Sequence, residues 1–228
     1  MPINDHAAAA IVDAFHQTAN LRRSDIFPDG KLTPLIASED AATAAPGWVG
    51  RSWSNGTLLV GINPGGGGDR YRRNPTDDQL YSLARTFRDA TTELEKAEHF
   101  LALSAKWIDI QRTHSIWRII DLIMKATQEQ ADEIAFLNIL PFRTRMDALP
   151  SRAILQVAWD RAAQPQIWAL RPKRIIALGK KAWNVMSRFA LPPGTELILF
   201  KRGIGDSYIP DESKAVLMRL AEALATNP

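Results

Sequence analysis

The fold of this chain is decided by a short apolar segment and the glycine-rich turn after it, which read Thr57-Leu58-Leu59-Val60-Gly61-Ile62-Asn63-Pro64-Gly65-Gly66-Gly67-Gly68. Leucines and β-branched residues predict a buried strand over Thr57–Ile62. Glycine permits positive φ and close approach of another molecule, so the strand is expected to lead into a tight, exposed turn. Open α/β sheets bind ligands at the carboxyl ends of their strands, which places Asn63 where a ligand would bind. A glycine loop with a turn asparagine is the other interpretation.

Strands and helices are predicted to alternate along the rest of the chain. Three further apolar segments predict strands at Ile134–Leu140, Arg174–Leu178 and Glu196–Phe200. Helical periodicity is found over Ala7–Phe15, from Thr76 to about Trp107 with room for a break, over Ser115–Ala126, from Ser151 through Ile167, over Gly179–Phe189, and from Asp211 or Ser213 onward. Parallel strands need helical crossovers that cover both faces. We therefore expect an α/β fold, a three-layer αβα sandwich with a mostly parallel sheet of about four strands.

The domain organisation is expected to be simple. No repeat or low-complexity linker divides the 228 residues, so residues 1–228 are interpreted as one domain. Residues 1–56 are expected to form an N-terminal helix followed by an irregular extension. The extension is interpreted as irregular because no periodicity is sustained from Leu21 to Asn55. Five tryptophans are expected in the core: Trp107, Trp117, Trp159, Trp168 and Trp183.

Composition excludes several classes of site. The chain has no cysteine, which rules out disulfides, thiolate nucleophiles, zinc–thiolate sites and a Cys-ligated iron–sulfur cluster. The N-terminus lacks a signal-peptide pattern and no apolar run is long enough to span a bilayer, so a cytoplasmic protein with no membrane partner is expected. A monomer without cofactor is the simplest expectation. With 28 basic and 25 acidic side chains the net charge is +3, which is compatible with an anionic partner.

Basic residues gather at the predicted carboxyl ends of the strands. Lys180 and Lys181 begin a predicted helix, where cations oppose the helix macrodipole, so an anion bound there would offset an unfavourable interaction. Two solvent-exposed lysines are the other interpretation. The same rim also carries Arg70, Arg72, Arg73, Arg143, Arg145, Lys201 and Arg202. This pattern is typical of a protein that binds a phosphate backbone, and a glycine loop beside it could accept an extruded base.

Competing motifs are absent from the sequence. The glycine run lacks the Gly-Lys-Ser/Thr ending of a P-loop and the GxGxxG spacing of a dinucleotide fold. The four histidines have no metal-ligand spacing, and no Gly-x-Ser-x-Gly elbow occurs.

Four segments occur in an order that points to a known family. Gly61-Ile62-Asn63-Pro64-Gly65 resembles the first motif of the uracil-DNA glycosylase superfamily, and its form is nearest to the mismatch-specific uracil and thymine glycosylase branch. Ser115–Ile120 resembles the helix that begins Arg-Phe-Trp in that branch. Phe136–Pro141 resembles the strand whose asparagine reads the base edge in other branches. Pro172–Trp183 resembles the Pro-x-x-(apolar)-Leu-Gly-Lys-x-Ala unit. The resemblance extends from about Thr57 to the C-terminus, interrupted by an apparent helical insertion at 77–113.

The resemblance implies hydrolysis of the N-glycosidic bond of uracil or a related damaged base in DNA, without a metal. Asn63 would be the catalytic residue that orients the attacking water. The substrate-binding residues implied are Gly61, Ile62, Gly65, Tyr71 and Asn138: backbone N–H groups near Ile62 and Gly65 would bind a base carbonyl, Asn138 would read the base edge and Tyr71 would stack on it. DNA would be bound by Lys180, Lys181, Lys201 and Arg202.

One motif of the superfamily is missing. His-Pro-Ser or Asn-Pro-Ser, followed by an intercalating side chain, should come after the fourth strand, but Phe200–Ser207 contains no histidine and no Pro-Ser. Lys201 or Arg202 is a candidate for the positive charge beside the leaving base, and Ile204 for the wedge. Two alternatives stay open: a noncatalytic nucleic-acid or nucleotide-binding protein of the same fold, and a hydrolase of free nucleosides or another small glycoside.

Overall fold

The computed structural model describes residues 5–27, 43–65, 75–144, 148–203 and 208–225. The strands are β1 (Trp48–Val49), β2 (Thr57–Gly61), β3 (Ala135–Asn138), β4 (Arg174–Leu178) and β5 (Glu196–Phe200). The helices are α1 (Asp5–Ala19), α2 (Arg23–Ile26), α3 (Pro75–Arg88), α4 (Glu93–Gln111), α5 (Trp117–Thr127), α6 (Arg152–Ala158), the π-helix η3 (Trp159–Ala163), α7 (Gln164–Leu170), α8 (Lys180–Met186) and α9 (Asp211–Ala225). The four predicted strands and the alternation with helices are confirmed.

The five strands form one sheet in the order β1-β3-β2-β4-β5. β2 pairs in parallel with both β3 and β4, and β4 pairs in parallel with β5. β1 pairs antiparallel with β3, with Trp48 opposite Phe136. The expectation of a mostly parallel α/β sheet is therefore confirmed, but the sheet has a fifth strand. Two residues are too few to produce a periodic pattern, so β1 could not be recognised in the irregular segment.

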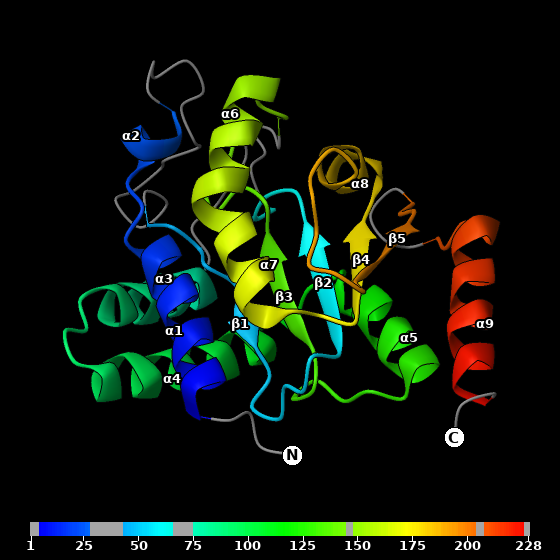
Figure 1. The fold of residues 1–228 in the computed structure, drawn as a ribbon, viewed down its shortest axis with the longest axis horizontal. Coiled ribbons are helices and arrows are strands. Elements are labelled where there is room, and N and C mark those ends of the chain that lie inside the picture. The colour runs from blue at the N-terminus through cyan, green and yellow to red at the C-terminus, as the bar shows by residue number, and fades with distance from the viewer. Residues whose placement is uncertain (1–4, 28–42, 66–74, 145–147, 204–207, 226–228) are drawn as a thin grey trace.

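Helices cover both faces of the sheet and make the three layers of the sandwich (Figure 1). The chain passes from β2 to β3 in one direction and from β3 back past β2 to β4 in the other. Because parallel crossovers are right-handed, opposite directions place the connecting helices on opposite faces. The packing agrees, since α7 contacts α1 whereas α5 contacts α9. α3 and α4 pack against each other, and α4 also contacts the edge strand β1.

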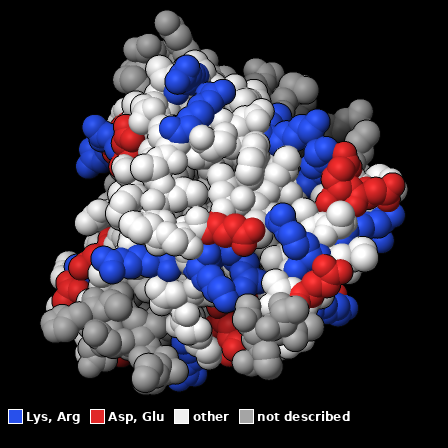
Figure 2. Space-filling model, turned by 45° about the vertical axis from the view of Figure 1, so that its right-hand side comes forward, with Lys and Arg blue, Asp and Glu red and all other residues white. Residues whose placement is uncertain are grey.

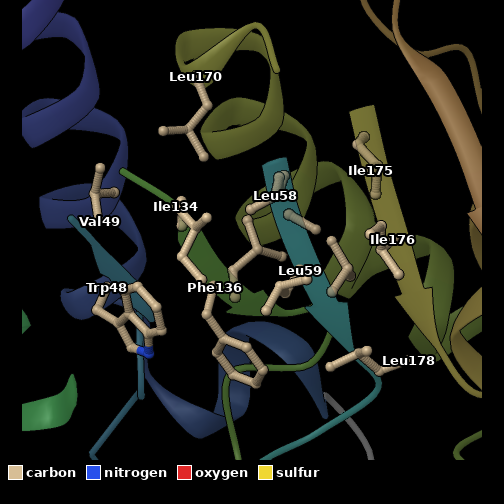
Figure 3. Packing of buried hydrophobic residues seen from close by; sticks show 14 of the residues in the cluster. Trp48, Val49, Leu58, Leu59, Ile134, Phe136, Leu170, Ile175, Ile176 and Leu178 are labelled. Carbon is tan, nitrogen blue, oxygen red and sulfur yellow. The ribbon is translucent and has the colours of Figure 1, made fainter. Parts of the chain in front are cut away.

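The core is built on the three central strands, whose residues are almost all buried. Figure 3 shows side chains of the three central strands, and in the sheet Leu59 of β2 lies in register between Phe136 of β3 and Ile176 of β4. Trp48 stacks on Phe136 with ring centroids 6.1 Å apart, and its indole N–H donates to Gln111 at the end of α4. Trp48 thereby joins the sheet edge to the α3–α4 pair.

One long helix combines α6, η3 and α7, and it contains Pro165. Ser151 caps its start as predicted, because the Ser151 hydroxyl accepts a hydrogen bond from the Ile154 amide. Proline lacks the amide hydrogen that would continue regular pairing, and the wider π turn ends two residues before it. Trp159 in the π turn stacks on Phe189, with centroids 4.4 Å apart and planes tilted by 7°.

Two other sequence expectations need adjustment. The break expected in the helical region from Thr76 is found between α3 and α4, and Thr92 and Glu95 form a capping box at the start of α4. Trp168 was expected in the core, but it is 41% exposed, so that prediction is wrong. Ile167 and Leu170 are buried on the side of α7 that faces the core, and Trp168 lies on the side that faces solvent.

Candidate functional site

The carboxyl end of β2 lies at the point where the strand connections change direction. β3 flanks β2 on one side and β4 flanks it on the other. Where the connections reverse, the loops that follow the adjacent strands run in opposite directions and leave a crevice between them. Open α/β sheets bind ligands in such a crevice. Ile62-Asn63-Pro64-Gly65 follows β2 at this point, and Asn63 is half-buried whereas Gly65 is exposed.

Asn63 is held by the segment that follows β3. The Ile139 and Leu140 amides donate to the carbonyl oxygens of Gly61 and Ile62, at 3.1 and 2.9 Å, so the two chains stay paired beyond the strands. Four residues later, the fully buried Thr144 accepts a hydrogen bond of 2.7 Å from the side-chain amide of Asn63. With its amide hydrogen directed at Thr144, Asn63 has its carbonyl oxygen available as an acceptor.

Asn138 occupies the register position opposite Gly61. It is 5% exposed, and a Cβ atom added to Gly61 would lie 2.3 Å from the Asn138 side-chain oxygen. A larger residue at position 61 would therefore require the Asn138 carboxamide to move. The structure therefore provides a packing reason for Gly61, which the sequence pattern associated with substrate.

A buried arginine directly precedes Thr144 in the chain. Arg143, directly before Thr144, is 8% exposed, and its guanidinium carbon lies 5.6 Å from the centre of the Tyr81 ring of α3. Tyr81 is itself buried. We call Asn63, Asn138, Arg143, Thr144 and Tyr81 the β2–β3 cluster.

A separate basic cavity lies at the carboxyl ends of β4 and β5. Its volume is about 590 Å³, and its lining residues are Ile62, Leu178, Gly179, Lys180, Lys181, Lys201, Arg202, Gly203, Pro210 and Glu212. Gly179 enters α8 with φ of 101°, a conformation that favours glycine. Four cations and one carboxylate give this cavity a positive charge, which suits an anionic ligand.

Lys201 is held by an acidic residue of the same cavity. Lys201 donates a hydrogen bond of 2.6 Å to Glu212, and this contact holds the pKa of the Glu212 carboxyl below its ordinary value. The Lys201 carbonyl also accepts from the buried hydroxyl of Ser213, which ties the start of α9 to the end of β5. On the face drawn in Figure 2, basic side chains form several separate groups with acidic side chains near some of them.

The structure thus divides the predicted site residues between two places. Ile62, Lys180, Lys181, Lys201 and Arg202 line the basic cavity. Asn63 and Asn138 lie in the β2–β3 cluster and are not among the described lining residues of the cavity. Ile62 belongs to the cavity and directly precedes Asn63, so the two places adjoin. Tyr71, Arg145 and residues 204–207 lie outside the described residues.

Sequence reasoning missed Thr144 and Tyr81, and it assigned Arg143 only to a basic rim. The sequence contained one signal for Arg143 and Thr144, which is that both follow shortly after the strand that carries Asn138. The contact between Thr144 and Asn63 joins residues 81 apart in the chain, which no local pattern indicates.

Two other kinds of feature are absent from the described residues. They contain no group of three His, Asp or Glu side chains arranged to hold a metal ion. None of the helices in the described ranges combines the length and apolar character needed to cross a membrane.

Comparison with known proteins leaves function to be argued from the site. No model of a known protein family matches the chain, and no curated protein matches it in sequence.

Proposed function

We propose that this chain is a DNA base glycosylase that hydrolyses the N-glycosidic bond of uracil or a related damaged base. The observation that carries the proposal is the side chain of Asn63, fixed by Thr144 at the topological switch point of the sheet and next to a basic cavity. The resemblance of four ordered segments to the uracil-DNA glycosylase superfamily supports the same function and the same fold family.

Asn63 supplies the group that positions water. Its amide hydrogen is directed to Thr144, so its carbonyl oxygen accepts a hydrogen bond from a water molecule and orients that water toward C1′ of the sugar. A neutral amide is a weak base, so its contribution is orientation rather than proton abstraction. A slow enzyme is the expected consequence.

The basic cavity supplies the contact with DNA. Lys180, Lys181 and Arg202 are exposed and line it, so their charges face the position of backbone phosphates beside the flipped nucleotide. Asn138, on the neighbouring strand, is the amide assigned to the edge of the base. In this arrangement the base lies over the β2–β3 cluster and the phosphates lie over the cavity.

Base release from defined oligonucleotides tests the proposal. The purified protein is incubated, with EDTA present, with single- and double-stranded oligonucleotides that carry one uracil, and alkali then cleaves the abasic sites formed. The unsubstituted chain should produce strand breaks at the uracil position, Asn63→Ala should lose most of them, and Asn20→Ala at the exposed end of α1 should retain them. Absence of breaks across a panel of damaged bases would refute the proposal.

One observation favours the noncatalytic alternative, a nucleic-acid or nucleotide-binding protein of the same fold. The segment after β5 lacks a histidine, and Lys201, which could replace it, is bound to Glu212. This alternative predicts DNA binding that weakens with salt, without abasic products. Cleavage of free nucleosides without any need for a DNA backbone would instead identify a nucleoside hydrolase.

A further inference from the structure

A second, smaller hollow lies between α6 and α8, and we call it the α6–α8 recess. Its volume is about 50 Å³, and its lining residues are Arg152, Leu155, Gln156, Val185, Arg188 and Phe189. Three of them belong to α6 and three to the end of α8, in both cases at the spacing i, i+3 and i+4 that places residues on one helix face. Each of the two segments contributes one arginine.

The walls of the recess are held in place by packing. Leu155 and Val185 are buried, and the Phe189 ring stacks on Trp159 of the π turn. The Arg188 amide donates to the carbonyl oxygen of Val185 at 3.2 Å, so the chain continues as a turn beyond the last residue of α8. The stacked rings therefore fix the segment that contains Arg188 against the long helix that begins with α6.

The recess has a positive charge. Arg152 and Arg188 are both exposed, and neither forms an ion pair with an acidic side chain among the described residues. The acidic residue nearest along α6 is Asp160, which accepts a hydrogen bond of 2.8 Å from the side-chain amide of Gln156. Guanidinium groups stay protonated, and their planar arrays of donors fit phosphate oxygens, so two arginines at one hollow favour a phosphate group.

The volume limits what the recess can hold. Pockets for drug-sized molecules measure roughly 300–1,000 Å³, so a whole nucleotide does not fit. A water-sized group needs about 10–15 Å³, and 50 Å³ therefore accommodates roughly three to five such groups. This is enough for the oxygens of one phosphate, with the attached sugars and bases outside.

The recess and the basic cavity lie at opposite ends of α8. Lys180, at the start of the helix, lines the cavity, whereas Arg188 lines the recess. With a rise of 1.5 Å per residue, the two positions are about 12 Å apart along the helix. Figure 1 shows that α8 and the first turns of α6 lie beyond the carboxyl ends of the central strands, on the side of the proposed site.

Resting on the proposed function, we infer that the α6–α8 recess binds a backbone phosphate of the DNA to one side of the excised base. Each nucleotide of one strand advances by about 3.4 Å along a duplex, so 12 Å corresponds to roughly three to four nucleotides. The DNA crosses α8 between the basic cavity, which faces the phosphates beside the flipped nucleotide, and the recess. A phosphate contact fixes position without reading sequence, so flanking DNA of any sequence is required on that side.

Trimming the DNA tests this contact. Fluorescence anisotropy is measured with a labelled uracil-containing duplex that extends about ten base pairs to each side of the uracil, and with duplexes that keep about two on one side or the other. For the unsubstituted chain, trimming one of the two sides should weaken binding roughly tenfold, because a charge-assisted contact with a phosphate is lost. Trimming the other side should have a much smaller effect.

Two substitutions made together assign the effect to the recess. Arg152→Gln with Arg188→Gln should weaken binding of the full duplex by the same factor, and trimming of the sensitive side should then have no further effect. Arg161→Gln is the matched control, because Arg161 is an exposed arginine of the same long helix that pairs with Asp25 outside the recess. The control should retain both the affinity and the effect of trimming. A trimming effect that persists in the double variant, or an equal loss in the control, would overturn the inference.

Two further measurements separate the remaining outcomes. Inorganic phosphate might raise the melting temperature of the unsubstituted chain but not of the double variant; without any effect of trimming, this result would assign a free phosphate ion to the recess and overturn the DNA contact. Base release from the same duplexes tests the proposed function separately. Release that is insensitive to trimming and to the double substitution would refute the contact alone. Binding that depends on the recess, without base release, would refute the glycosylase and support the contact.

Discussion

Thr144 accepts a 2.7 Å hydrogen bond from the side-chain amide of Asn63, and this contact joins the segments that follow two neighbouring parallel strands. Thr144 is fully buried while Asn63 is half-buried. The hydroxyl therefore fixes the orientation of a side chain that reaches the crevice.

Replacing Thr144 by valine tests the importance of this hydrogen bond. Valine keeps the shape but removes the acceptor, so the free energy of unfolding should fall by about 1 kcal/mol. Base release should slow because the Asn63 amide is free to rotate. Urea denaturation and single-turnover rates measure the two effects. Thr144→Ser keeps the hydroxyl and should retain most of the stability and most of the rate of base release. Equal decreases of these two quantities in the serine and valine variants would show that the hydrogen bond is unimportant.

Gly61→Ala should destabilise the protein. The new Cβ would lie 2.3 Å from the side-chain oxygen of Asn138, and this overpacking should lower the free energy of unfolding by about 1–3 kcal/mol. Gly65→Ala, in the turn that follows β2, is the control, because among the residues that the structure describes no heavy atom outside the adjacent residues lies within 4 Å of its added Cβ. The control should change stability by less than about 0.5 kcal/mol. Equal effects of the two substitutions in chemical denaturation would contradict the assigned packing role.

Lys180→Ala combined with Lys181→Ala should reduce the affinity for DNA in a salt-dependent way. For each phosphate that is no longer neutralised, the slope of log affinity against log salt should become shallower by about 1. Fluorescence anisotropy with a labelled oligonucleotide measures both affinity and slope. Lys125→Ala removes an exposed lysine of α5 that is paired with Asp121, and it should leave the slope unchanged. The same decrease in affinity and slope in Lys125→Ala would show that DNA binding depends only on the net charge of the protein.

The capping box of α4 should make stability depend on pH. Hydrogen bonds from the backbone amides of Thr92 and Thr91 hold the pKa of the Glu95 carboxyl at about 2, below its ordinary value of 4.5. Because the pKa is lower in the folded state, the contribution of Glu95 is complete above about pH 4.5 and is lost as pH falls toward 2.

Glu95→Gln isolates this contribution. The variant should melt at a lower temperature than the unsubstituted chain at pH 6, and the difference should shrink steadily toward pH 2. Thermal denaturation at several pH values measures it. A difference in melting temperature that stays constant across this range would mean that the Glu95 charge is not responsible.

Local patterns were sufficient for the elements whose signal lies within a few residues. The apolar segment at Thr57 and the serine cap at Ser151 are examples, because burial and capping act on neighbouring residues. β1 escaped prediction because two residues become a strand only by pairing with Phe136, far along the chain. The exposure of Trp168 likewise depends on which side of α7 meets the rest of the molecule.

The candidate site was predictable only in part. Placing Asn63 and the lysines at the carboxyl ends of strands follows from the alternation of strands and helices. Their division between two adjoining places depends on the strand order, which the sequence pattern does not contain. The contacts of Thr144 and Tyr81 depend on packing between segments distant in sequence.

The π turn before Pro165 determines how this region can change in evolution. Leu155, Trp159, Ala163 and Ile167 are all buried and recur every four residues, a longer repeat than the 3.6 residues of an α-helical turn. The wider turn absorbs the difference, so Trp159 reaches Phe189 while Ile167 still faces inward. Removing a single residue from 159–163 would rotate one half of the helix by about 100° relative to the other and turn its buried side chains outward. Changes of residue type should therefore be tolerated in this stretch far more readily than changes of length.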